Sequence, residues 1–141
     1  MKILLAVDGS EYSQRAASFL ANNVSALAQG PEIHCLHVHA PIPYPGAAKA
    51  VGKGAIEKYQ REESEAALAP AKKALLAANL DPKCSWSVGD VVEEIGKYVK
   101  KNKIDLIVLG SHGRGSLAAL TLGSVAMKVL AAVKTPALII R

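Results

Sequence analysis

Short runs of apolar residues recur along the chain and predict a set of buried strands. Ile3–Val7 and Leu106–Leu109 are apolar at every position, as strands are when helices cover both faces of a parallel sheet. Lys83–Val88 instead alternates apolar residues with serines, which indicates one wetter face and therefore a strand at the edge of the sheet. The five predicted strands are Ile3–Val7, Ile33–Val38, Lys83–Val88, Leu106–Leu109 and Ala137–Ile140.

Each of the four stretches between these strands contains a segment with helical periodicity. Ser10 is placed to cap the first helix, and Asp90–Glu93 forms a capping box for a later one. Residues 55–79 have a helical composition, but Pro70 predicts a kink there, or two helices with the proline in the first turn of the second. A last helix opens at Gly123 and Ser124. The apolar faces of the four segments are Tyr12, Ala16, Phe19, Leu20, Val24 and Leu27; Ala67, Ala71, Leu75 and Ala78; Val92, Ile95 and Val99; and Ala126, Val129, Leu130 and Val133.

The alternation of strand and helix predicts an α/β fold. Strands that alternate with helical segments are typical of a parallel sheet covered by helices on both faces. We therefore expect a single doubly wound domain over residues 1–141, with a five-stranded parallel sheet. A chain of this length fits one domain.

The composition is that of an ordinary globular protein with a modest positive charge. Lys and Arg number 17 against 12 acidic residues, which gives a formal net charge of +5. The lysines are scattered, and one Phe and one Trp supply little surface for base stacking. The charge is therefore interpreted as solvated helix faces, and no nucleic-acid partner is expected.

The cysteines and histidines predict neither a disulfide framework nor a metal site. Cys35 and Cys84 lie in predicted strands and are interpreted as small core residues in a reducing compartment. His37 and His39 share one face of a strand, but no third ligand is spaced nearby. The apolar run Ile3–Val7 is too short for a signal peptide or a membrane span, so a cytoplasmic location without membrane insertion is expected.

A glycine-rich segment follows the fourth predicted strand. Gly110–Ser116 holds three glycines in six residues, and glycine permits positive φ and a close approach of ligand to backbone. Consecutive amides in such a loop can form an anion nest, and Arg114 can add charge. Gly123 and Ser124 sit at a helix start, where free amides and the helix dipole favour a phosphate. The segment is neither a Walker A loop nor a Rossmann fingerprint, and a plain tight turn remains the alternative.

Residues after two other strands complete the predicted ligand edge, because ligands bind beyond the carboxyl ends of the strands in open parallel sheets. Asp8 follows the first strand, where it can hold Mg²⁺ through a bound nucleotide or simply cap the first helix. Pro41–Gly46 follows the second strand; three prolines in five residues predict a loop, which could gate or block a pocket.

The pattern Gly110-x2-Gly113-x9-Gly123-Ser124 resembles the nucleotide-binding signature of the universal stress protein family. The opening Ile3–Ser10, the strand Leu36–Val38 and the turn Val88–Asp90 are also similar to that family, so the resemblance covers the whole chain. It implies the strand order 3-2-1-4-5, with Lys83–Val88 at one edge and Ala137–Ile140 at the other. It also implies the subclass that binds ATP, or ADP or AMP, because none of the signature glycines is replaced.

The resemblance implies roles for particular residues. Asp8 would contact the ribose, the Val38 backbone would meet the adenine, and Gly110 and Gly113 would line the ribose and phosphates. The backbone amides of Gly123, Ser124 and Val125 and the Ser124 hydroxyl would hold the phosphates. A homodimer would form through the last strand, at Ala137, Leu138, Ile139 and Ile140. The full predicted nucleotide set is Ala6, Val7, Asp8, Val38, Leu109, Gly110, His112, Gly113, Arg114, Gly123, Ser124 and Val125.

These features predict a nucleotide-dependent regulatory or stress-response binding module. Phosphoryl transfer needs a positioned water or acceptor and usually an acid or base, and the chain offers no obvious general base. Two alternatives stay open: a slow ATPase or nucleotide phosphotransferase, and a nucleotide-independent scaffold that acts as a dimer.

Overall fold

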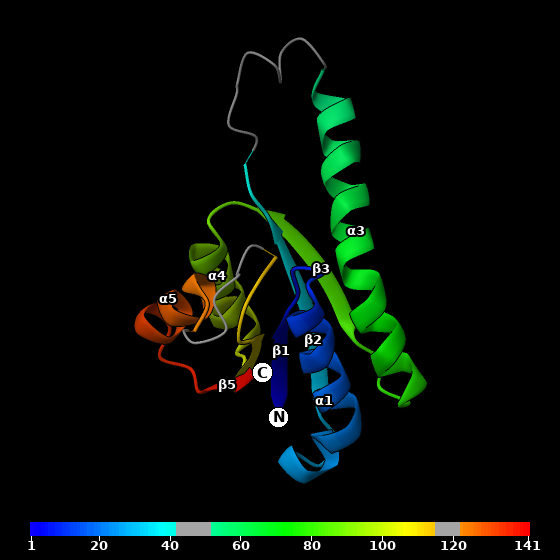
Figure 1. The fold of residues 1–141 in the computed structure, drawn as a ribbon, viewed down its shortest axis with the longest axis vertical. Coiled ribbons are helices and arrows are strands. Elements are labelled where there is room, and N and C mark those ends of the chain that lie inside the picture. The colour runs from blue at the N-terminus through cyan, green and yellow to red at the C-terminus, as the bar shows by residue number, and fades with distance from the viewer. Residues whose placement is uncertain (42–51, 115–121) are drawn as a thin grey trace.

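The computed structural model describes residues 1–41, 52–114 and 122–141. Strands and helices alternate along the described chain (Figure 1). The strands are β1 (Lys2–Ala6), β2 (Glu32–His39), β3 (Lys83–Val88), β4 (Leu106–Gly110) and β5 (Ala137–Ile140). The helices are α1 (Glu11–Leu27), α3 (Lys53–Ala77), α4 (Val91–Asn102) and α5 (Ser124–Ala132).

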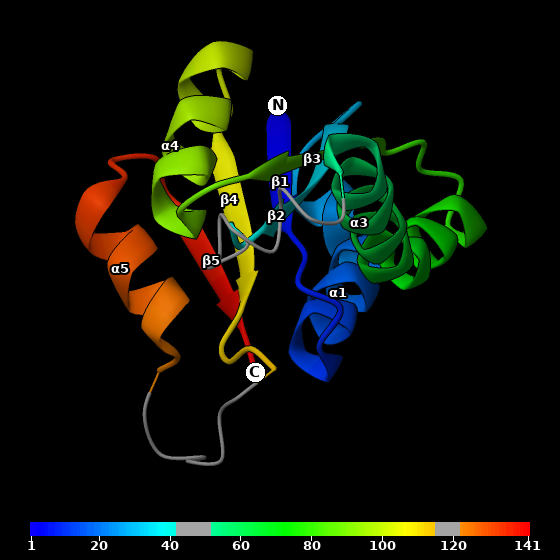
Figure 2. The same cartoon turned by 90° about the horizontal axis from the view of Figure 1, so that it is seen from above.

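The five strands form one parallel sheet in the order β3-β2-β1-β4-β5. Figure 2 shows α1 and α3 on one face and α4 and α5 on the other. The predicted fold class, strand order and edge strands are confirmed. The chain passes to one face after β1 and to the other after β4, so these neighbouring strands mark the switch point of the sheet.

Alternation along the central strands divides the core into two layers. Ile3 and Leu5 of β1 pack toward α1 and α3, whereas Leu4 packs in the layer beside α4 and α5. All three side chains are fully buried. The unbroken apolar run in the sequence therefore reflects a strand covered on both faces.

Two helices begin at the predicted capping residues. The Ser10 hydroxyl accepts a hydrogen bond from the Ser13 amide at 3.2 Å. The Asp90 carboxylate accepts from the amides of Val92 and Glu93, at 3.0 and 3.1 Å. These side chains satisfy donors that the first helical turn leaves without partners.

Two local predictions need correction. Pro70 lies within the continuous helix α3 rather than between two helices. Proline has no amide hydrogen, so the carbonyl of Ala66, four residues earlier, loses its usual helical partner. Ala66 and Pro70 are both exposed, so water can hydrogen bond to that carbonyl oxygen. Leu130, predicted on the buried face of α5, is 47% exposed, while Ala126 and Val129 are buried.

Among the described helices, none has the length and apolar character needed to cross a membrane.

A polar cluster ties the amino-terminal ends of β2 and β3 together. The Glu32 carboxylate accepts hydrogen bonds from Lys83 Nζ at 2.7 Å and from His34 Nε2 at 2.8 Å. His34 is buried, and its Nδ1 lies 2.9 Å from the Tyr98 hydroxyl. The hydrogen bond from Lys83, then the one from His34, lowers the pKa of Glu32 to about 2.

Glu32 should therefore contribute to the acid stability of the fold. Its pKa is depressed in the folded state, so its contribution is present above the unfolded value of about 4.3 and is lost as the pH falls toward about 2. Glu32→Gln should flatten the pH dependence of the unfolding free energy across that window, as measured by urea titration. Glu65→Gln, at an exposed position on α3, is the matched control and should keep the wild-type slope.

Candidate functional site

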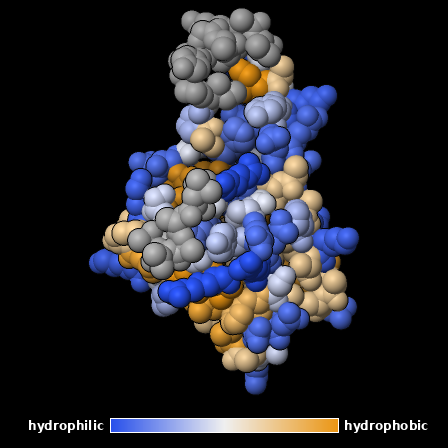
Figure 3. All heavy atoms as spheres, in the orientation of Figure 1, coloured by the Kyte–Doolittle hydropathy of each residue, from blue (hydrophilic) through white to orange (hydrophobic). Residues whose placement is uncertain are grey.

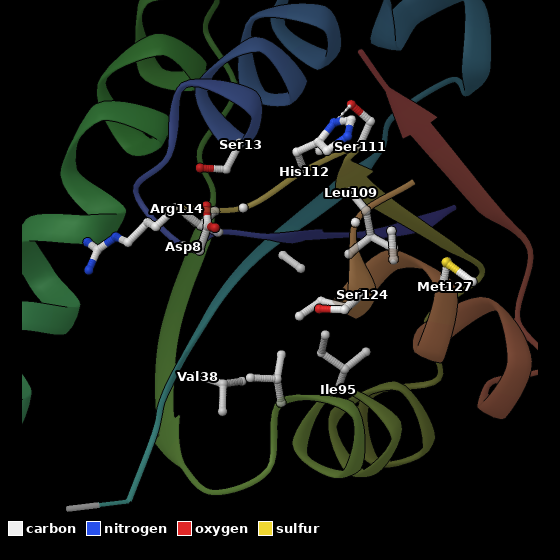
Figure 4. Close-up of a pocket in the computed structure, with 18 of the residues that line it drawn as sticks. Asp8, Ser13, Val38, Ile95, Leu109, Ser111, His112, Arg114, Ser124 and Met127 are labelled. Atoms are coloured by element: carbon white, nitrogen blue, oxygen red, sulfur yellow. Dashed lines mark hydrogen bonds between the residues drawn. The ribbon is translucent and has the colours of Figure 1, made fainter. Parts of the chain in front are cut away.

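A cavity of about 690 Å³ opens at the carboxyl ends of β1, β2 and β4, on the face covered by α4 and α5 (Figure 4). Its volume is in the range of small-molecule and cofactor sites. All twelve residues predicted to contact a nucleotide line this one cavity. They come from the carboxyl ends of β1, β2 and β4, the turns after β1 and β4, and the start of α5, which the parallel sheet brings to a common edge.

The apolar wall of the cavity was not predicted from the sequence. Leu36, Val91, Ile95 and Met127 line it in addition to the predicted Val38. Figure 4 shows Val38 and Ile95 on one side of the space, with Met127 beside the start of α5. An apolar wall opposite polar loops suits a ligand with a flat apolar part and a charged part.

Asp8 is held in a fixed turn at the end of β1. Its Oδ1 accepts a hydrogen bond from the Ser10 amide at 2.9 Å, and Ser10 rather than Asp8 is the N-cap of α1. The intervening Gly9 has φ of 78°, a conformation that side chains rarely adopt. Oδ2 of Asp8 lies only 2.8 Å from where a Cβ on Gly113 would stand, so the two loops meet there.

The signature glycines permit close packing, not left-handed backbone. None of Gly110, Gly113 and Gly123 has a positive φ, so of the two properties that glycine permits these three positions use only the close approach. A Cβ on Gly110 would lie 2.8 Å from the backbone of Tyr12, and one on Gly123 would lie 2.9 Å from the Ser111 carbonyl oxygen. Larger residues at these positions would displace protein backbone whether or not a ligand is bound.

The amino terminus of α5 opens into the cavity with backbone donors that have no partner among the described residues. The Gly123 amide donates to the Ser111 carbonyl oxygen at 2.7 Å, which closes the loop between β4 and α5. That amide, predicted to hold phosphate, is therefore engaged within the protein. The amides of Ser124, Val125 and Ala126 precede the first helical hydrogen bond, from Met127 to Gly123 at 3.0 Å. Within the described part of the chain, no side chain caps this helix, unlike α1 and α4.

The backbone of Val38 also faces the cavity with open hydrogen-bonding groups. Pairing of β1 with β2 ends where the Val7 amide donates to the Leu36 carbonyl oxygen at 2.9 Å. Alternate residues of a strand point their N–H and C=O to the same side, so Val38 faces the position that β1 has vacated. Neither group of Val38 has a backbone partner there among the described residues.

The two charged or titratable side chains of the glycine loop point elsewhere. In Figure 4 the Arg114 side chain runs away from Ser124 and toward α3. Its Nη2 lies 2.9 Å from the Cβ position of Gly9, and the residue is exposed. His112 hydrogen bonds through Nδ1 to the Ser111 hydroxyl at 2.9 Å, and its ring packs 4.9 Å from that of Tyr12. Its Nε2 is buried without a partner within the described residues.

The histidines of β2 serve the fold beneath this site. His37 is buried, and its Nδ1 donates to the Val7 carbonyl oxygen at 2.7 Å. Burial lowers the pKa of His37, so the ring is neutral at pH 7. The ring of His39 packs edge-on against Tyr59. No group of three or more metal-ligating side chains gathers within residues 1–41, 52–114 and 122–141.

Known proteins resemble this chain over its whole length. The sequence model of the universal stress protein family matches residues 1–141. The "Universal stress protein in QAH/OAS sulfhydrylase 3'region" of Thermus aquaticus is 32% identical over an alignment of 145 positions, which covers 99% of this chain and 97% of that protein.

Solved structures share the fold. Universal stress protein UspA from Lactobacillus plantarum superposes with a TM-score of 0.83 at 23% identity, over 100% of this chain and 97% of the other. A universal stress protein solved in complex with cAMP superposes with a TM-score of 0.65 at 25% identity, over 100% of this chain and 96% of the other.

Proposed function

This chain belongs to the universal stress protein family, and from that membership we propose that its cavity binds an adenine nucleotide, ATP foremost. The bound nucleotide then alters how the protein interacts with a partner. One observation carries the proposal: the amides at the start of α5 and the backbone groups of Val38, which lack partners within residues 1–41, 52–114 and 122–141, face the same cavity. The first group suits phosphate and the second suits the edge of a base.

The phosphates are assigned to the first turn of α5. The amides of Ser124, Val125 and Ala126 and the Ser124 hydroxyl supply donors, and the helix dipole adds a partial positive charge. Charge-assisted hydrogen bonds of this kind contribute about 1.5–3 kcal/mol each. The long, exposed Arg114 can turn toward the phosphates only by leaving its place beside Gly9.

The base is assigned to the apolar wall and to Val38. Adenine carries a donor at N6 next to an acceptor at N1, which matches the C=O and N–H of one extended residue. Leu36, Val91 and Ile95 would cover the faces of the ring. The cAMP complex of a family member at 25% identity supports an adenine nucleotide as the ligand. Asp8 Oδ2 remains for a ribose hydroxyl or for Mg²⁺ carried by the nucleotide.

Binding, rather than turnover, is the proposed activity. Asp8 is the one carboxylate among the described residues that line the cavity, and its Oδ1 already accepts the Ser10 amide. A general base must reach the attacking water. We assign the Asp8 carboxylate to a contact with the ligand instead.

Isothermal titration calorimetry with ATP, ADP and AMP tests the proposal directly. We expect saturable binding with one site per chain, and nucleotide released from freshly purified protein on denaturation. Circular dichroism establishes that the titrated protein is folded. Absence of binding at millimolar ATP by folded protein would overturn the assignment.

We also propose a homodimer that pairs β5 of two copies. The amide of Ile107 donates to the Pro136 carbonyl oxygen at 2.9 Å, and that of Ser111 to the Ile140 carbonyl oxygen at 2.7 Å. By alternation, Leu138 also faces β4, whereas Ala137 and Ile139 point their backbone groups to the open edge. In Figure 3 hydrophobic surface lies around the place that β5 occupies in Figure 1, which favours a partner strand.

Ile139→Pro should convert this dimer to a monomer while leaving the fold intact. Proline removes the outward amide of residue 139 but no hydrogen bond to β4. Leu138→Pro is the matched contrast, because it removes a ladder hydrogen bond and should lower the melting temperature. Sedimentation velocity gives the molar mass. A monomeric wild type, or a dimeric and stable Ile139→Pro protein, would contradict the arrangement.

A further inference from the structure

Cys35 and Cys84 lie opposite each other on neighbouring strands. β2 and β3 are parallel, and in their register Cys35 pairs with Cys84. Both side chains pack in the core layer beneath α1 and α3, so they project from the same face of the sheet. Residues paired in this way have Cα atoms about 4.8 Å apart, inside the 4.4–6.8 Å range that disulfides span. Both cysteines are reduced in this structure.

The two thiols differ in exposure. Cys35 is fully buried in the middle of the core, whereas Cys84 is partly exposed on the edge strand β3. Cys84 is therefore the more accessible of the two to a reagent from solution. Lys72 of α3 places a positive charge near Cys84, and Asp81 opposes it.

The interaction between the neighbouring thiols makes the difference chemical as well. Interaction with the Cys35 thiol lowers the pKa of Cys84 to about 7. The same interaction, together with burial, raises the pKa of Cys35. At pH 7 about half of the Cys84 thiol is therefore the nucleophilic thiolate, while the buried Cys35 sulfur keeps its proton.

From this geometry we infer that Cys84 is a site of oxidation by hydroperoxides and that Cys35 resolves it into a disulfide between β2 and β3. The Cys84 thiolate attacks one peroxide oxygen, the O–O bond breaks, and the leaving oxygen departs as water or an alcohol after taking a proton. The product is a sulfenic acid on Cys84. The Cys35 sulfur then attacks the Cys84 sulfur, the S–S bond forms, and the S–O bond breaks. The hydroxide that leaves takes the Cys35 proton and departs as water, so two thiols give up two electrons to one hydroperoxide.

The bond should be readily reversible. Directly paired residues must draw their Cβ atoms to the 3.5–4.5 Å that a disulfide needs, which strains both strands. Strained disulfides are more oxidising and are reduced more easily by cellular thiols. Val38 lies in β2, and β3 continues through Gly89 into α4, which carries Val91 and Ile95. These three residues line the cavity, so the cross-link would join two parts of its wall.

The test treats folded protein with hydrogen peroxide, blocks remaining thiols with an alkylating agent, and maps the products by peptide mass spectrometry. The wild type should yield an intramolecular Cys35–Cys84 disulfide that dithiothreitol removes. Cys35→Ser keeps a small polar side chain opposite Cys84 but cannot form a disulfide, so a dimedone-reactive sulfenic acid should accumulate on Cys84.

Alkylation of Cys84 by iodoacetamide at pH 7 gives a second measurement that does not need a disulfide. Cys35→Ala removes the neighbouring thiol, and a return of the pKa of Cys84 from about 7 to 9.0 would lower its thiolate fraction at pH 7 about fiftyfold. The more basic thiolate is intrinsically about tenfold more nucleophilic, so the alkylation rate should fall by roughly fivefold. Circular dichroism melts check that each variant is folded.

Two results would overturn the inference. One is wild-type protein in which peroxide produces no disulfide within the chain, or only disulfides between chains. The other is Cys84 that is alkylated equally fast in the wild type and in folded Cys35→Ala. Urea-unfolded wild type, in which both thiols react, shows that the reagents were active.

Discussion

ATP will bind this protein at least about a hundredfold more tightly than ITP. The two nucleotides differ only at the 6-position and the adjacent N1, where adenine offers a donor and an acceptor and hypoxanthine offers the reverse. The C=O and N–H of Val38 have no backbone partner among the described residues where β1 ends, and they match the N6 donor and N1 acceptor of adenine. With hypoxanthine, the Val38 C=O would face the O6 acceptor and the Val38 N–H would face the N1–H donor. An unsatisfied buried group costs about 1–3 kcal/mol, so two mismatches account for a hundredfold loss. Competition calorimetry at one salt concentration measures the ratio.

Purine riboside triphosphate is the matched control ligand, because it lacks the 6-amino group and keeps the N1 acceptor. Its affinity should fall between those of ATP and ITP, since only the hydrogen bond to the Val38 carbonyl is lost. Equal affinity for ATP and ITP, with binding that still depends on Ser124, would place the base away from Val38 while keeping the phosphates at α5.

Local signals in the sequence predicted much of the fold. Ser10 and Asp90 cap their helices as expected, because capping depends on a side chain and amides two or three residues away. The edge position of β3 followed from its alternating serines, since one face of an edge strand remains wetter. Pro70 left a kink and a break between two helices both open, and only the break is wrong, because its effect depends on whether the orphaned carbonyl reaches water, which the sequence does not specify.

The candidate site was predicted in its loops but not in its walls. Asp8 and Gly113 could be assigned because each follows a strand, and parallel strands bring such loops to one edge. Val91, Ile95 and Met127 lie on α4 and α5, and their place depends on how those helices pack. The engaged amide of Gly123 and the pairing of Cys35 with Cys84 were likewise invisible, because each joins residues that only the fold brings together.

The glycine signature has a structural cause that bears on how function should be tested. A Cβ added at Gly110 would lie 2.8 Å from the Tyr12 backbone, and one added at Gly123 would lie 2.9 Å from the Ser111 carbonyl oxygen. Valine at either position would therefore disturb the fold itself. Loss of binding in such a variant would not separate a damaged site from a damaged loop. Ser124 is the better probe, because it is exposed and occupies the first position of α5.

Ser124→Asp will make the helix more stable and abolish tight ATP binding. A carboxylate in the first turn interacts favourably with the helix dipole, by about 0.3–1 kcal/mol, so the melting temperature should hold or rise by about 2–5 °C. The same carboxylate would stand where the phosphates are proposed to bind. Two like charges 4 Å apart near a protein surface repel by about 4 kcal/mol. Since Ser124 is exposed and partly screened, we expect at least about a hundredfold loss of affinity.

Ser124→Asn separates charge from the loss of the hydroxyl, because asparagine has nearly the size of aspartate and no charge. It removes one hydrogen bond to phosphate, so affinity should fall by only about tenfold. The difference in ATP affinity between Ser124→Asp and Ser124→Asn should narrow as the salt concentration rises. Salt screens the charge repulsion in the Asp variant, whereas both variants lack the hydroxyl at any salt concentration. Stability and affinity thus move in opposite directions for Asp alone, and a general loss of folding cannot produce that pattern. Wild-type affinity in folded Ser124→Asp would show that the phosphates do not bind at the amino terminus of α5.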